Sequence, residues 1–220
     1  MVEWSPDGRD LLLGVAGFSI NRQTIGHLGQ REELGVGYSP SYTPDGRYLI
    51  MAQRQSGDDW DLVYKEVGSG DEWVRIVDAP QGQLSPRVSP DGRYLVYMSN
   101  ENGKDVVYLR EFPSGAGLWQ VSVDGGSWPQ WSAAGDRIYY VREDTIFEVD
   151  VELGASLRLS RARPVVTRPA LSWSLIFGWP AGFDVSTDGQ RFLVCLPVGE
   201  EDRGEGIVVV ENWLTEAGKS

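Results

Sequence analysis

A short turn sequence centred on Ser-Pro-Asp-Gly recurs along the chain and constrains its fold more than any other feature. Three full copies occur: VEWSPDGR at residues 2–9, PSYTPDGR at 40–47 and PRVSPDGR at 86–93. Two weaker copies follow, PQWSAAGDR at 129–137 and FDVSTDGQR at 183–191. Successive turn glycines are 38, 46, 43 and 54 residues apart: Gly8, Gly46, Gly92, Gly135 and Gly189. Because a four-stranded propeller blade takes ~40–50 residues, this spacing predicts an all-β fold, a β-propeller of about five four-stranded antiparallel blades.

The columns of this alignment have a physical interpretation. An apolar column holds Trp4, Tyr42, Val88, Trp131 and Val185. The next column is a hydroxyl column that holds Ser5, Thr43, Ser89, Ser132 and Ser186. Because side chains alternate along a strand, we expect these two columns to lie on opposite faces. Pro, Asp and Gly suit successive positions of a tight turn, so the motif is interpreted as a hairpin connector and its aspartates as structural.

Short β-rich runs follow each turn and are separated by clusters of Gly, Asn, Asp and Ser, which predicts antiparallel hairpins. The third repeat shows the unit most fully, with strands expected at residues 94–98, 106–112 and 118–122. The first strand after each turn is expected at residues 10–14, 47–52, 93–99, 137–141 and 191–196. No segment keeps a 3.6-residue apolar period, so we expect minimal helix content.

The last repeat offers strands at residues 183–186, 191–196 and 207–213, which predicts a three-stranded last blade. We expect residues 1–220 to form a single propeller domain, with repeats that start near residues 2, 40, 86, 129 and 183. Propellers protect their edge strands by closing the ring. The sequence does not choose among three arrangements: a closed five-bladed ring, an open arc, and closure by another chain. These arrangements predict a monomer or a dimer sealed by edge strands.

At residues 99–141 the chain resembles the TolB-type, WD-like β-propeller repeat, as found C-terminal to bacterial serine/threonine protein kinases. The runs FDVSTDGQRFLV and IVVVENWLTE near the end are similar to the close of those propellers. The resemblance implies a module for protein–protein or small-ligand recognition. The chain also departs from the family, because family members usually have six or more blades and this sequence has five repeat starts. The sequence contains no kinase Gly-rich loop, HRD motif or DFG motif, so kinase activity is not carried over.

The residue inventory predicts that the chain is not an enzyme and carries no cofactor or metal. Its only histidine, His27, is expected in an outer strand over residues 23–30, without a positioned partner of the kind that a catalytic triad needs. No G-x-S-x-G elbow occurs, and one His and the lone Cys195 lack zinc-ligand spacing. Cys195 is expected to be a small core residue. The acidic clusters around Asp59 and Glu201 are interpreted as solvated turns, because neither has EF-hand spacing.

The formal net charge of −12 argues against nucleic acid and against anionic membrane surfaces as partners. No run of about 18 apolar residues is present, so we expect no membrane insertion. No signal peptide is visible, which favours the cytoplasm for the chain as given. The chain starts inside a repeat, and a piece cut from a membrane-anchored parent would instead lie outside the cytoplasm.

Two candidate recognition sites follow from what varies around the repeat. The position before the apolar column is polar and differs in every copy: Glu3, Ser41, Arg87, Gln130 and Asp184. We call this set the inner-strand column, and we expect it to line the propeller channel, where ordinary solvation is the alternative. Residues 164–180 form an insertion with Trp173 and Trp179, which we interpret either as an exposed interface patch or as a lid over the core.

Two functional hypotheses stand at this stage. The first is a non-catalytic TolB-like propeller that recognises a protein partner or a small ligand, either as a complete module or as a sensor fragment of a larger kinase-type protein. The second is the propeller of a prolyl-oligopeptidase-type serine peptidase whose hydrolase domain lies elsewhere. The neighbouring coding sequence distinguishes them.

Overall fold

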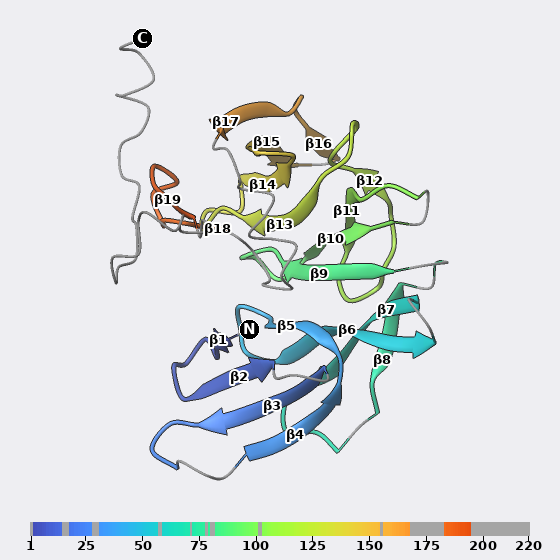
Figure 1. Ribbon diagram of the computed structural model, residues 1–220, viewed down its shortest axis with the longest axis vertical. Coiled ribbons are helices and arrows are strands. Elements are labelled where there is room, and N and C mark those ends of the chain that lie inside the picture. The colour runs from blue at the N-terminus through green and yellow to red at the C-terminus, as the bar shows by residue number, and fades with distance from the viewer. Residues whose placement is uncertain are drawn as a thin grey trace, which may run out of the picture. The chain divides into compact units, whose positions relative to one another are not determined.

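The computed structural model describes residues 2–14, 18–27, 31–56, 59–70, 72–77, 79, 82–100, 103–154, 156–167 and 183–194 (Figure 1). Every regular element in this part of the chain is a β-strand. The chain divides into two compact units, residues 1–129 and residues 130–220. No helix in the described ranges has the length and apolar character that a membrane span requires.

The first unit contains three four-stranded antiparallel sheets, in which strands pair in chain order. The first sheet comprises β1 (Val2–Trp4), β2 (Asp10–Gly14), β3 (Ser19–Thr24) and β4 (Arg31–Val36). The second comprises β5 (Tyr38–Tyr42), β6 (Tyr48–Ser56), β7 (Asp59–Glu66) and β8 (Val74–Val77). The third comprises β9 (Gln83–Val88), β10 (Tyr94–Ser99), β11 (Val106–Glu111) and β12 (Trp119–Gln120). Each sheet is one sequence repeat, as the turn spacing predicts.

The second unit contains the fourth sheet and part of a fifth. The fourth sheet is built from β13 (Ser127–Trp131), which begins at the end of the first unit, β14 (Arg137–Arg142), β15 (Thr145–Leu153), β16 (Leu157–Leu159) and β17 (Arg163–Thr167). Two short strands share its outer position, because β16 and β17 each pair with β15 along different stretches. The fifth sheet shows β18 (Phe183–Val185) paired with β19 (Phe192–Val194). The strand expected at residues 207–213 and Cys195 lie outside the described residues.

The repeated turn is held by a small hydrogen-bond network. In the third repeat the Ser89 hydroxyl donates to Asp91 Oδ1 (2.5 Å) and accepts from the Tyr94 backbone N–H (2.9 Å). Asp91 Oδ1 also accepts from the Arg93 N–H (3.1 Å). Matching bonds occur in the turns that begin at Ser5, Thr43 and Ser186. The turn glycines have φ between 68° and 75°, the left-handed region that glycine tolerates best.

The fourth turn keeps the same geometry with a different residue. Its sequence has Ala134 where the other turns have aspartate. The Ser132 hydroxyl instead donates to Asp136 Oδ1 (2.8 Å), one residue after the glycine, and accepts from the Arg137 N–H (3.1 Å). The carboxylate therefore comes from a later position in the sequence, while its hydrogen bond to the hydroxyl is preserved.

The position of the hydroxyl column differs from the sequence prediction. We expected the hydroxyl on the strand, opposite the apolar residue. Each hydroxyl residue instead follows the end of its strand, as Ser5 follows β1, and its oxygen is bonded within the turn. The reason is that the buried hydroxyl satisfies a backbone N–H that the turn leaves without a ladder partner.

The core lies between consecutive sheets. Along β6, Leu49 and Met51 pack with the first sheet, whereas Ile50 and Ala52 pack with the third. This alternation follows from the two-residue period of a strand, and it makes the second sheet apolar on both faces. In the second unit, a corresponding cluster joins β14, β15, β17, β18 and β19 around Tyr139 and Phe183.

Two boundary predictions were wrong. His27 is not in an outer strand over residues 23–30, because β3 ends at Thr24 and residues 25–27 lie in an exposed turn. Gly26 in this turn has φ of 85°, which breaks the strand. The insertion expected to start at Pro164 begins inside β17, where Val166 is buried against Ile146 of β15.

Candidate functional site

The structure brings together the members of the inner-strand column that lie in the first unit. Glu3, Ser41 and Arg87 occupy equivalent register positions, opposite Leu12, Ile50 and Val96 of the neighbouring strands. Equivalent positions in stacked sheets lie side by side, which explains how residues from three repeats meet.

Glu3 links the three sheets. One carboxylate oxygen of Glu3 accepts a hydrogen bond from the Tyr42 backbone N–H (3.1 Å). The other lies 4.0 Å from Arg87 Nη2, and Arg87 Nη1 donates to the Pro86 carbonyl (2.9 Å). The Glu3 and Arg87 side chains are only 24% and 18% exposed. The pair therefore presents opposite charges in a half-buried setting, where they are less screened than on an open surface.

Ser41 contributes differently from its two neighbours. It is 4% exposed, and its hydroxyl donates to the Tyr42 carbonyl at 3.4 Å, a long bond. Ser41 therefore supplies a small buried side chain to the column, and Glu3 and Arg87 supply its partly exposed charged groups.

The remaining members of the column lie in the second unit. Gln130 lies on β13 and is half-buried. Asp184 lies on β18 and is exposed, and its Oδ1 accepts from the Val185 N–H (2.8 Å). Trp173 and Trp179 lie outside the described residues, so the choice between an interface patch and a lid stays a prediction.

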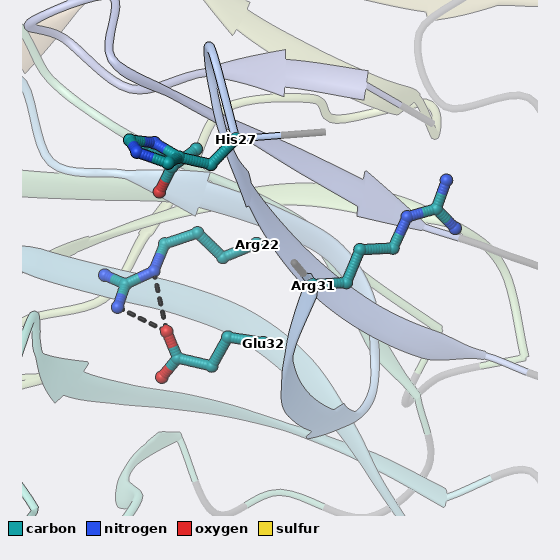
Figure 2. Close-up of a pocket in the computed structure, with 5 residues that line it drawn as sticks. Arg22, His27, Arg31 and Glu32 are labelled. Atoms are coloured by element: carbon teal, nitrogen blue, oxygen red, sulfur yellow. Dashed lines mark hydrogen bonds and ion pairs between the residues drawn. The ribbon is translucent and has the colours of Figure 1, made fainter. Parts of the chain in front are cut away.

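A second polar site, which the sequence analysis missed, lies at the outer side of the first sheet. A hollow of about 420 Å³ is lined by Arg22, Thr24, His27, Arg31 and Glu32, and we call it the basic hollow (Figure 2). In Figure 2 the Arg22 guanidinium turns toward Glu32, and Arg22 Nε donates to Glu32 Oε2 (2.9 Å). Burial opposes the charge on Arg22, but the hydrogen bond and the charge of Glu32 raise its pKa overall.

The sequence contained a signal for this pair. Arg22 and Glu32 face each other directly in the β3–β4 hairpin. Opposite charges placed symmetrically about Gly26 and His27 are typical of a cross-strand pair. The prediction of a strand through residues 23–30 concealed this arrangement.

The described residues contain no group of three or more His, Cys, Asp or Glu side chains placed to hold a metal ion. Carboxylates in the repeated turns are committed to local bonds. The pKa values of Asp7, Asp45 and Asp188 are lowered, first by the hydroxyl that donates to each carboxylate and then by a backbone N–H. These groups are ionised structural acceptors, in agreement with the interpretation of the turn aspartates.

Successive four-stranded meanders that pack face to face define a β-propeller fold. Comparison with solved structures supports this class directly: the crystal structure of TolB from Acinetobacter baumannii superposes with a TM-score of 0.69 at 18% sequence identity, over 90% of this chain and 48% of TolB. A chain of hydrazine synthase from Kuenenia stuttgartiensis superposes with a TM-score of 0.55 at 14% identity, over 68% of this chain and 51% of the other. The chain thus has a TolB-like propeller fold and spans about half of the length of that TolB.

No protein-family model matches the sequence. A search of curated proteins likewise found no match. The similarity to solved structures therefore establishes the fold, and function is argued from the site.

Proposed function

We propose that this chain is a non-catalytic recognition module that binds a protein partner or a small polar ligand through the inner-strand column. The observation that carries the proposal is the meeting of Glu3 and Arg87, which come from different repeats and are both half-buried. Three sheets supply different polar groups at one register position, whereas the turn next to it keeps the same chemistry in every repeat. A shared scaffold with variable polar groups is the arrangement that recognition requires.

The charges indicate the kind of contact. Glu3 and Arg87 are opposite in sign, so this part of the column offers both a carboxylate acceptor and a guanidinium donor. Such a pair favours a partner with mixed polar groups and disfavours a uniformly charged surface such as nucleic acid. The net charge of −12 likewise disfavours nucleic acid as a partner.

The proposal includes a sensor role within a larger kinase-type protein. The genomic test is to sequence the flanking coding region. A kinase domain followed by a membrane helix upstream supports this role, whereas a hydrolase domain downstream supports the peptidase alternative.

The biochemical test uses quantitative affinity capture with the purified chain and two column variants, Glu3→Gln and Arg87→Gln. Arg93→Gln is the matched control, because Arg93 is an exposed turn arginine that pairs with Asp91. We expect a defined set of captured proteins to be depleted about tenfold or more by both column variants and retained by the control, since a lost charge-assisted hydrogen bond weakens binding by that order. An identical captured set for all four proteins would refute the proposal.

A further inference from the structure

A groove lies between the first and second sheets of the first unit. It has a volume of about 250 Å³, and its walls include Arg22 and Glu32 from the first sheet and Tyr42, Leu49 and Lys65 from the second. We call it the inter-sheet groove. It shares Arg22 and Glu32 with the basic hollow of Figure 2, so this ion pair forms part of the wall of both.

Tyr42 has a buried hydroxyl that finds no acceptor among the described residues. The residue is 8% exposed, and its Oη makes no hydrogen bond of good geometry, although the Arg22 guanidinium lies near it. Burial raises the pKa of Tyr42 to about 12; the charges of Asp10 and Glu3 raise it further, and the neighbouring Arg22 opposes this rise. The hydroxyl therefore keeps its proton at neutral pH and is available as a donor. An unsatisfied buried hydroxyl is costly, so its retention at the wall of a groove points to a ligand that accepts this hydrogen bond.

Lys65 supplies a cation without an acidic partner. It is half-buried, and its Nζ lies 4.9 Å from the centre of the Trp73 ring, in a cation–π contact. Within the described part of the chain, Lys65 forms no ion pair with a carboxylate. A positive charge in this state is available to an anion.

Arg22 adds further donors. Its hydrogen bonds to Glu32 use one Nε–H and one Nη2–H, both on the same carboxylate oxygen. A guanidinium has five N–H groups, so Arg22 has three besides those bonded to Glu32, and the group also lies beside the Tyr42 hydroxyl. The three charged side chains of the groove, Arg22, Lys65 and Glu32, together carry one net positive charge.

We propose that the inter-sheet groove binds a small anionic ligand through a carboxylate or phosphate group. Lys65 Nζ is its ion-pair partner, and Tyr42 Oη and the Arg22 guanidinium donate hydrogen bonds to it. A separate hollow that Tyr42 also lines is bordered by Asp7, Asp10 and Asp45, which repel anions, so we place the ligand at the Lys65 side of the groove. The proposal does not rest on recognition through the inner-strand column, although Tyr42 contributes to both sites, because its backbone N–H binds Glu3.

Isothermal titration calorimetry of the full chain tests the site, with inorganic phosphate and succinate as separate probes at constant ionic strength. We expect saturable binding of at least one probe, weakened about tenfold by Lys65→Gln and by Tyr42→Phe, because each removes a hydrogen bond to a charged group. Lys104→Gln is the matched control, since Lys104 is an exposed lysine of the third sheet and its replacement changes the net charge equally. Binding of phosphate alone identifies a phosphate-bearing ligand, and binding of succinate alone identifies a carboxylate.

Three results would overturn the proposal: no saturable binding of either probe, equal binding by the two groove variants and the original chain, or equal weakening by Lys104→Gln. Thermal unfolding without anions gives a separate readout. We expect Tyr42→Phe to leave the melting temperature unchanged or higher, because the hydroxyl it removes has no acceptor in the part of the chain that the structure describes. Tyr97→Phe is the contrast, since Tyr97 Oη accepts from Arg110 Nε (3.0 Å), and this variant should melt lower. Equal losses in both would show that the Tyr42 hydroxyl is satisfied within the fold, which refutes its role as a ligand donor.

Discussion

Replacement of Ser89 by alanine tests whether the repeated turn is a stabilising hydrogen-bond network. Ser89 is 1% exposed, and its oxygen donates to Asp91 and accepts from the Tyr94 N–H. The variant removes a charge-assisted bond and leaves a backbone donor without its partner. Net hydrogen-bond contributions are about 0.5–1.5 kcal/mol for neutral pairs and 1.5–3 kcal/mol for pairs with a charged group. Part of the charged contribution is lost because Asp91 is accessible to solvent, so we expect the free energy of unfolding to fall by about 2 kcal/mol.

The assay combines thermal unfolding with amide hydrogen exchange. A loss of about 2 kcal/mol corresponds to a melting temperature lower by roughly 5–10 °C for a unit of this size. The Tyr94 amide should exchange faster than in the original chain, because its acceptor is gone. Ser114→Ala is the control, since Ser114 is exposed and accepts one long bond from the Ala116 N–H (3.2 Å). If both variants lose the same stability, or if exchange at Tyr94 is unchanged, the turn network does not stabilise the fold as argued.

Two further predictions concern the same turns. Because the folded pKa values of Asp7, Asp45 and Asp188 are lowered, their contribution to stability is present above the ordinary aspartate pKa of about 3.9 and is lost as the pH falls below it. Melting temperatures measured from pH 5 to pH 3 should therefore fall less steeply for Asp45→Asn than for the original chain, and parallel curves would contradict this linkage. Gly92→Ala should cost about 1 kcal/mol in urea unfolding, because φ is 75° while nothing lies within 4 Å of the added methyl group. A loss well above that would show that steric contact, and not backbone strain, requires the glycine.

The repeat predicted the architecture because its chemistry is local. The strand after each turn was predicted within four residues at its described ends: the bounds agree for β2, expected at residues 10–14, and β10 begins one residue later than the expected 93–99. Prediction failed where no strong turn sequence marks the boundary, as at His27, and where β16 and β17 share one outer position. In the fourth repeat, only the structure revealed that Asp136 accepts the hydroxyl bond of the turn, because the sequence has no aspartate at the usual position.

The candidate sites were predictable only in part. The sequence indicated which residues vary at one position of the repeat, including Glu3 and Arg87. It did not indicate that they would approach each other, that Ser41 would be buried, or that Arg22 would pair with Glu32. It gave no reason to select Tyr42 beyond its place in the apolar column.

By itself, the sequence determined that this protein consists of repeated antiparallel meanders, because each turn is specified by hydroxyl, carboxylate and glycine within a few residues. Only the tertiary structure decided which polar groups meet, because those contacts depend on how successive sheets stack. The bond from the Tyr42 N–H to Glu3 joins residues 39 positions apart, and no local pattern encodes that distance. The setting of the Tyr42 hydroxyl is likewise a product of packing, since its burial between two sheets supplies no acceptor from the described residues.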